Sequence, residues 1–123
     1  MGLPRCYRLR GHRVFAALYQ HHRQVRGQFF RLRYRPHPEG TGLEVAVVVS
    51  SKVSKKAVQR NRLKRQIRAA LRQLLPACTP AWQMVVTAQP QALTGQYADF
   101  LRELEQLLQQ AGIIHGHSGR GDF

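Results

Sequence analysis

Acidic residues are scarce in this chain, whose 123 residues include six Asp and Glu against twenty Lys and Arg. Residues 1–38 contain nine arginines and no carboxylate, and residues 45–98 contain nine Lys or Arg and again no carboxylate. A nuclease that works with two metal ions needs clustered carboxylates to hold them, and no such cluster accompanies the basic stretches. The sequence therefore predicts a protein that holds a polyanion but has neither catalytic residues nor a metal site of its own.

Cysteines and long apolar runs are also few. Cys6 and Cys78 lie far apart and show no CxxC spacing, so the sequence predicts neither a zinc site nor a disulfide framework. No run of about eighteen apolar residues, the length of a transmembrane helix, occurs anywhere, and the beginning of the chain lacks the apolar stretch of a signal peptide. We therefore expect a cytoplasmic protein with no membrane partner.

What the sequence does contain is typical of a single basic domain. Apolar residues make up 43% of the chain, enough for one core, and the formal net charge is +14. Such a charge favours a polyanionic partner. We expect residues 1–114 to form one domain that binds this polyanion and begins with a basic arm at residues 1–10. The small, polar residues 115–123 are expected to form a flexible tail.

The first half of the chain predicts one helix and two strands. Apolar residues at spacings of three and four predict a helix over residues 11–22. Residues 28–35 alternate apolar side chains with arginines, a pattern typical of a half-buried strand with a basic outer face. The Pro- and Gly-rich residues 36–42 predict a turn, and residues 43–50 (LEVAVVVS) predict a more buried strand. We expect these two strands to pair as a hairpin.

The second half predicts a long basic helix over residues 55–75, a short apolar strand over residues 82–88, and a closing helix from Tyr97 to Ala111 that Gly112 ends. The expected fold class is α+β. It is a single-domain α-β sandwich in the order α-β-β-α-β-α, with room for a third strand in the first β segment, around a central, mostly antiparallel sheet.

The basic helix combines an apolar stripe with an uninterrupted run of cations. Ser54 is expected to cap its beginning. The stripe expected to dock on the sheet consists of Leu63, Ile67, Ala70, Leu71 and Leu74. Basic residues recur at intervals of four on another side, namely Lys56, Arg60, Lys64, Arg68 and Arg72. Like charges at this spacing repel by about 0.2 to 0.5 kcal/mol per pair, a repulsion that bound phosphates would relieve.

Three interpretations compete for this charge. A merely solvated face usually mixes acidic and basic residues, and this helix has no acid. A helix lying on a membrane surface presents Trp and Phe opposite its charges, whereas here the opposite side is needed for the core. Binding to nucleic acid is therefore favoured, and the guanidinium groups suit it because they fork onto phosphate oxygens and stack on bases.

The run SSKVSKKAVQRNRLKRQIRAALR, with Arg60-Asn61-Arg62 at its centre, resembles the signature of the bacterial ribonuclease P protein subunit. The resemblance extends more weakly over about residues 5 to 112. It implies a cytoplasmic protein that binds a catalytic RNA and precursor tRNA, and neither DNA nor membrane. In this family the RNA cleaves off the 5′ leader of the precursor tRNA with Mg²⁺ that is bound mainly by the RNA. The resemblance also implies a left-handed crossover through the basic helix.

The resemblance assigns roles to two sets of residues. One set is expected to contact the catalytic RNA: Lys52, Lys55, Lys56, Arg60, Asn61, Arg62, Lys64, Arg65 and Arg68. The other set is expected to line a cleft between the first helix and the sheet that accepts the single-stranded leader: Phe15, Tyr19, Phe30 and Arg33. Aromatic residues at helical spacing usually belong to a core, so Phe15 and Tyr19 owe this role to the resemblance and to nearby arginines.

Two other functions remain open on the residues alone. A structural RNA-binding protein, for instance of the ribosome, would have the same charge and size, but the RNR signature and the upstream aromatic residues favour the ribonuclease P subunit. A DNA-binding regulator would use residues 55–75 as a recognition helix. That function is disfavoured because predicted strands, and not a short helix and turn, precede this helix.

Overall fold

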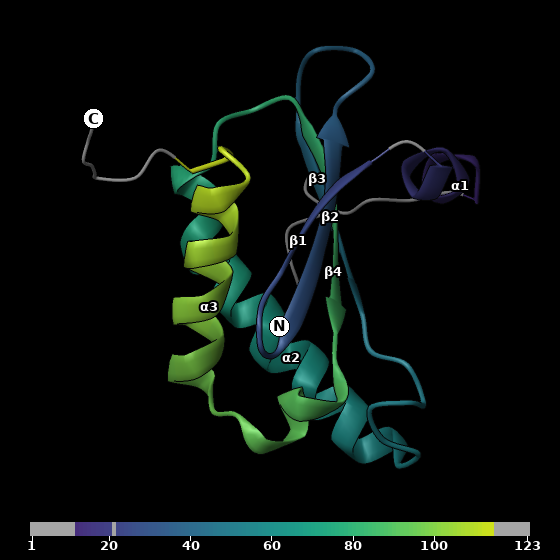
Figure 1. The fold of residues 1–123 in the computed structure, drawn as a ribbon, viewed down its shortest axis with the longest axis vertical. Helices are drawn as coiled ribbons and strands as arrows, with labels where there is room; N and C mark the ends of the chain where they lie inside the picture. Colours follow the sequence, from purple (N-terminus) through teal and green to yellow (C-terminus); the bar gives the residue numbers. More distant parts are fainter. Residues whose placement is uncertain (1–11, 21, 115–123) are drawn as a thin grey trace.

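The computed structural model describes residues 12–20 and 22–114 (Figure 1). The predicted basic arm at residues 1–10 and the predicted tail at residues 115–123 lie outside them. The elements, in chain order, are α1 (His12–Gln20), β1 (Arg23–Arg26), β2 (Phe30–Pro36), β3 (Leu43–Val48), α2 (Ala57–Leu74), the 3-10 helix η2 (Leu75–Ala77), β4 (Trp82–Ala88), the 3-10 helix η3 (Pro90–Thr94) and α3 (Tyr97–Gln110). None of the described helices is long and apolar enough to cross a bilayer. The predicted α+β sandwich is confirmed.

The four strands form one mixed sheet in the order β1-β2-β4-β3. β2 pairs antiparallel with β1 and with β4, while β3 pairs parallel with β4. The predicted hairpin between the second and third of these strands is therefore wrong, because β4 lies between them. β4 is buried along most of its length, as expected for a strand with a neighbour on each side. The hairpin partner of β2 is β1. It is the third strand for which the expected order left room, although its four residues, RQVR, include one apolar side chain and gave no pattern that located it.

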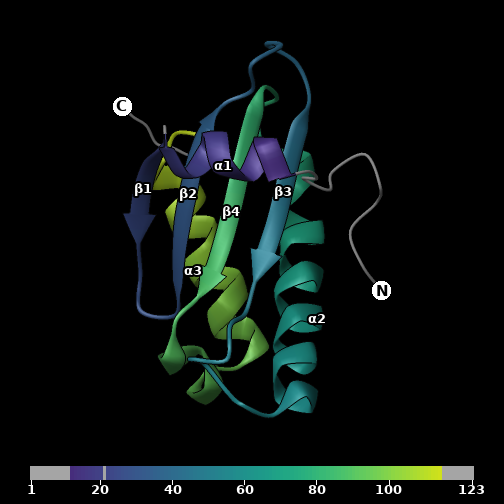
Figure 2. The ribbon, with the colours of Figure 1, turned by 90° about the vertical axis from the view of Figure 1, so that its right-hand side faces the viewer.

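The connection from β3 through α2 to β4 is a left-handed crossover. β3 and β4 are parallel neighbours, and α2 passes on the side of the sheet opposite α1 (Figure 2). Connections of this type are right-handed in about 98% of cases. The crossover implied by the resemblance is thus present, although the hydrophobic pattern of the sequence contains no signal for it.

The sheet separates a large core from a small one. α2 and α3 cover one face of the sheet and α1 crosses the other (Figures 1 and 2). On α2 the predicted apolar stripe is confirmed, since its buried residues are Leu63, Ile67, Ala70, Leu71 and Leu74. Under α1, Leu18 packs on Val85 of β4, and both are fully buried. The large core therefore holds the sheet to α2 and α3, and the small core holds α1 in place.

The ends of the two long helices differ in how well the sequence predicted them. The N-cap of α2 is Lys56 and not Ser54. The hydroxyl of Ser54 instead accepts a hydrogen bond from the backbone N–H of Lys56 at 3.1 Å, within the loop that precedes the helix. At the end of α3, Gly112 has φ 78°, the left-handed conformation that a helix-terminating glycine adopts.

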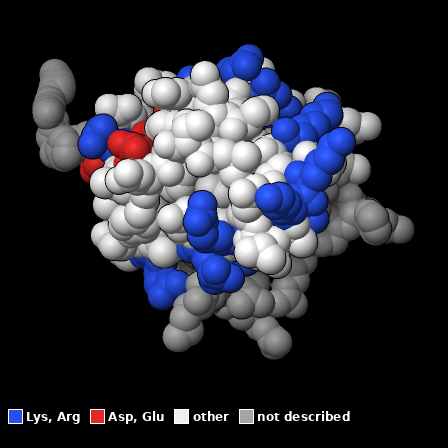
Figure 3. Space-filling model, turned by 90° about the horizontal axis from the view of Figure 1, so that it is seen from below, with Lys and Arg blue, Asp and Glu red and all other residues white. Residues whose placement is uncertain are grey.

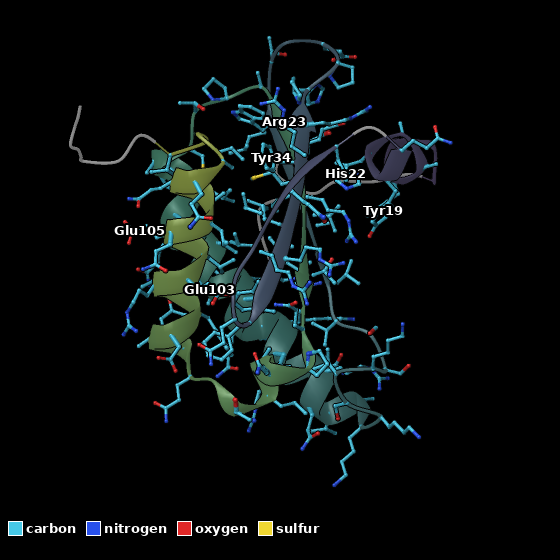
Figure 4. All side chains as sticks on the ribbon, viewed as in Figure 1. Tyr19, His22, Arg23, Tyr34, Glu103 and Glu105 are labelled. Atoms are coloured by element: carbon cyan, nitrogen blue, oxygen red, sulfur yellow. The ribbon has the colours of Figure 1, made fainter. Side chains whose placement is uncertain are left out.

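One buried carboxylate fastens the β1–β2 hairpin to α3. Glu103 is 9% exposed, and its oxygens accept hydrogen bonds from the backbone N–H groups of Gln28, Phe29 and Phe30, each at 2.8 Å. Gly27 leaves room for this carboxylate, because a Cβ at that position would collide with the carboxyl group of Glu103. The acidic residue thus has a structural role, in contrast to Glu105, which lies on the outer side of α3 (Figure 4).

Replacing Glu103 with Gln should lower the free energy of unfolding by about 1 to 3 kcal/mol, because the amide loses the negative charge and one acceptor while three N–H donors stay in place. Urea denaturation measures the change. Glu105→Gln on the same helix is the matched control and should shift the midpoint little. Equal shifts for the two variants would show that the contacts of Glu103 with the hairpin contribute no special stability.

Candidate nucleic-acid interface

The basic side chains of α2 lie on two flanks of the helix. At 3.6 residues per turn, Arg60, Lys64 and Arg68 share one flank, and all three are half-buried. Arg62, Arg65 and Arg72 share the other flank, and these are exposed. Asn61, which is also exposed, lies between the flanks. The predicted stripe at intervals of four, with Arg62 and Arg65 beside it, therefore forms one continuous basic surface that has a half-buried flank and an exposed flank.

Most of the charge on these two flanks is not neutralised by carboxylates. Within the described part of the chain, no ion pair is formed by Arg60, Arg62, Lys64, Arg65 or Arg68. The two ion pairs that are found there, His37–Glu44 and Arg102–Asp99, lie outside α2. Figure 3 shows Lys and Arg distributed over much of one end of the molecule, with Asp and Glu at one edge. Each buried Leu or Ile side chain of α2 contributes about 1.5 to 3 kcal/mol, against about 0.2 to 0.5 kcal/mol of repulsion per pair of like charges. Packing therefore keeps the helix folded in spite of its charge.

The loop that leads into α2 extends the basic surface. Lys52, Lys55 and Lys56 are exposed there, while Val53 between them is buried and anchors the loop to the core. At the helix itself, Nη1 of Arg60 donates a hydrogen bond to the carbonyl oxygen of Ser54 at 2.9 Å. All nine residues predicted to contact the catalytic RNA therefore lie on α2 or on this loop, and Arg60 also helps to hold the loop in place.

Three of the four residues predicted to line the cleft lie together on the α1 face of the sheet. Tyr19 is 42% exposed, and the guanidinium carbon of Arg33 lies 5.1 Å from the centre of its ring. Arg33 also donates from Nη1 to Thr87 Oγ1 at 3.4 Å. Phe15 is half-buried and packs on the small core of Leu18 and Val85. Figure 4 shows Tyr19 projecting from α1.

Phe30 does not belong to this cleft. It is fully buried, and its ring packs edge-on against Phe100 of α3 with 5.2 Å between the ring centres. The reason is the strand alternation, which places Phe30 on the same face as Leu32 and Tyr34, toward α2 and α3, and Arg33 on the face of α1. The assignment of Phe30 to the cleft is therefore corrected to a core residue.

Two residues that were not assigned to either surface also lie on them. Arg31 faces the same side of β2 as Arg33, and its Nε is buried without a hydrogen-bond partner among the described residues. The alternation of arginines in β2 contained the signal for it. Val58, in the first turn of α2, is 79% exposed among basic neighbours, where it offers an apolar contact to a sugar or base. No pattern in the sequence distinguished Val58 from a core residue.

The described residues include one cysteine and several other groups that could carry chemistry. Burial raises the pKa of the Cys78 thiol to about 12, so this thiol is protonated at neutral pH and is a poor nucleophile. Among the residues that the structure describes, no three His, Cys, Asp or Glu side chains are grouped so as to hold a metal ion. The described surface offers cations and partly exposed aromatic rings.

The fold and the basic surface of α2 define a small, strongly basic α+β protein. Comparison with known proteins gives its family. The model of the ribonuclease P family matches residues 3–112, and the chain belongs to this family.

Named relatives and a solved structure agree with this membership. The ribonuclease P protein component of Microcystis aeruginosa is 44% identical over 120 residues, covering 95% of this chain and all of the relative. The component of Synechocystis sp. is 44% identical over 96% of each chain. The structure of the Staphylococcus aureus RNase P protein matches with a TM-score of 0.79 at 24% identity, covering 89% of this chain and 98% of that one. At this identity the structural match shows the fold.

Proposed function

We propose that this chain is the protein subunit of ribonuclease P, an endoribonuclease that removes the 5′ leader of precursor tRNA, and that it binds RNA on two surfaces. The first is the basic surface of α2 and its preceding loop, which takes the catalytic RNA. The second is the α1 face of the sheet, which takes the leader. The observation that carries the proposal is that Arg60 and Arg62, on either side of Asn61 in α2, have no carboxylate partner among the described residues. The match of the chain to the family over residues 3–112 supports it.

The α1 face supports the second contact through its mixture of aromatic and cationic groups. Tyr19 and Arg33 form a partly exposed stacked pair, and Arg31 adds a further guanidinium beside them on the strand. Unpaired bases stack on aromatic rings and on guanidinium planes with little demand on sequence. Such a surface suits leaders that differ in sequence from one tRNA to the next.

The chemistry in this proposal is carried by the RNA subunit, with Mg²⁺ bound mainly by that RNA. The protein holds the RNA subunit and the leader, and its cations offset the repulsion between two RNA molecules. Because that repulsion is also screened by Mg²⁺, the protein should matter most when Mg²⁺ is low. Adding the protein to a bacterial ribonuclease P RNA at low Mg²⁺ should accelerate cleavage of leader-bearing precursor tRNA. No acceleration under these conditions would contradict the proposal and would favour a structural RNA-binding protein.

The protein without its RNA partner should not cleave precursor tRNA. The reason is that carboxylates are missing from both basic stretches of the sequence, and a nuclease that holds two metal ions depends on such groups. The measurement is a cleavage assay with protein from which all RNA has been removed, beside the same protein with the RNA subunit restored. Cleavage at the mature 5′ end by the protein alone would overturn the assignment of the chemistry to the RNA.

A further inference from the structure

A hollow at the junction of α2 and α3 adjoins the exposed basic flank of α2 and includes residues that have no part in the RNA contacts proposed so far. It has a volume of about 460 Å³ and is lined by Arg62, Arg65, Gln66, Ala69, Arg72 and Tyr97. The hollow is widely open to solvent, so that a ligand there would remain partly exposed. α2 and α3 lie on the side of the sheet opposite α1 (Figure 1), so the hollow that they line is on that side as well.

The lining of the hollow combines flat apolar surface with cations. Its apolar lining residues are Ala69 and Tyr97, and Tyr97 is half-buried against the core. The ring is held in place because Nε2 of Gln73 donates a hydrogen bond to the Tyr97 hydroxyl at 2.8 Å. Three of the six lining residues are arginines and none is acidic.

The nearest acid in the sequence is already engaged elsewhere. Asp99, two residues after Tyr97, accepts a hydrogen bond from the backbone N–H of Gln96 at 3.0 Å and lies 3.9 Å from Arg102. It does not line the hollow. The lining therefore offers an anionic ligand the guanidinium groups of Arg62 and Arg65 and no carboxylate.

One polar group in the hollow is available to recognise a ligand. The side-chain amide of Gln66 has no hydrogen-bond partner among the described residues, although the residue is only partly exposed. An amide donates and accepts at once, as the edge of a nucleobase does. A free phosphate would use the arginines but would leave the ring, the methyl group and the amide without partners.

We propose that this hollow binds an unpaired nucleotide of the RNA subunit, with its base on Tyr97 and Ala69, its edge at Gln66, and its flanking phosphates at the arginines. The proposal rests on the proposed function, in which α2 contacts the catalytic RNA. The base must be unpaired, because a ring stacked within a duplex cannot also stack on Tyr97. The RNA subunit and not the leader is the source, because the hollow is on the opposite side of the sheet from α1.

The test compares variants of Tyr97 in the assembled complex. Tyr97→Leu keeps an apolar side chain and removes the ring, and it should weaken binding to a bacterial ribonuclease P RNA by about 5-fold or more, the effect expected for one stacked base. The dependence of binding on salt should not change, since no cation is removed. Tyr97→Phe retains the ring and should retain more of the affinity than Tyr97→Leu.

A second variant guards against a simple loss of folding in Tyr97→Leu. Ala69→Glu places a carboxylate in the lining of the hollow and should weaken assembly by about 10-fold, because it repels phosphate and competes for the arginines. Ala77→Glu makes the same substitution at an exposed position outside the hollow and is the control. Thermal unfolding of each variant, measured without RNA, separates loss of affinity from loss of fold.

Photo-crosslinking identifies the source of the nucleotide. With p-benzoylphenylalanine at position 97, the crosslink should map to an unpaired nucleotide of the RNA subunit in the complex with precursor tRNA. A crosslink to the leader, or affinities of Tyr97→Leu and Ala69→Glu equal to that of Ala77→Glu, would overturn the inference. If Lys64→Ala and Arg68→Ala on the other flank of α2 still weaken assembly in that case, the proposed function stands without it. If they too have no effect, the RNA contact of α2 fails as a whole.

Discussion

Removing Arg62 and Arg65 together should weaken binding to ribonuclease P RNA by about 100-fold at moderate salt. Both side chains are exposed, and neither forms an ion pair with a carboxylate among the described residues. In the complex each can therefore form a charge-assisted contact with a phosphate. Such contacts are worth about 1.5 to 3 kcal/mol each, and about 1.4 kcal/mol corresponds to a factor of ten. Arg60 is left unchanged because its bond to the Ser54 carbonyl also holds the loop.

The salt dependence of binding distinguishes a phosphate contact from a general effect of charge. Removal of one arginine that binds a phosphate should make the slope of log affinity against log salt shallower by about 0.7 to 0.9. The control is Arg102→Ala on α3, which removes the same charge from a side chain that is 67% exposed beside Asp99. It should alter neither affinity nor slope appreciably.

Folding should be almost unaffected in these variants, because exposed side chains without structural contacts contribute little stability. A double variant that unfolds more easily but binds with an unaltered slope would show that the arginines stabilise the protein and do not contact phosphate. An equal decrease of affinity in Arg102→Ala would show that only net charge matters.

The parts of the fold that the sequence predicted well are those in which burial repeats with a regular period. The apolar stripe of α2 and the alternation in β2 follow this rule, since each buried side chain recurs at the spacing of its element. Strand order does not follow it. β2 and β3 each present apolar residues to the same core, and nothing in their local pattern shows that β4, much later in the chain, pairs between them.

The candidate site was predictable to the extent that charge alone defines it. The basic surface of α2 follows from a run of cations without acids. Its division into two flanks required the positions of Arg60 and Arg62 relative to the buried side of the helix. Phe30 could not be assigned from type alone, because an aromatic residue beside arginines suits both a cleft and a core, and only the pairing of Phe30 with Ala88 in β4 decides its face. Tyr97 gave no signal, since its neighbours in the hollow are more than twenty residues away in sequence.

Replacing Tyr19 with Ala should reduce the preference of the reconstituted holoenzyme for precursor tRNA with a long leader over one with a single leader nucleotide. Tyr19 is 42% exposed and stacks on Arg33, so it is placed to stack on an unpaired base. Each stacked base contributes about 1 to 3 kcal/mol, which corresponds to a decrease of about 5-fold to 150-fold in that preference. Affinity for the RNA subunit should be retained, because the α1 face lies apart from the exposed flank of α2.

Substitution of Phe15 tests the same surface but also affects the stability of the protein. Phe15 is half-buried on the small core, so Phe15→Ala should both diminish the leader preference and lower the stability of the protein. Cavity formation at a fully buried Phe costs about 3 to 5 kcal/mol, and the partial burial of Phe15 places its cost below that range. Phe15→Leu fills most of the space without an aromatic ring and separates the two effects. Measuring leader discrimination and thermal unfolding on the same variants distinguishes a loss of leader binding from a loss of stability. If Tyr19→Ala and Phe15→Leu both discriminate leader length as well as the unmodified protein does, the α1 face does not bind the leader. Phe15 then serves only to hold α1 on the sheet.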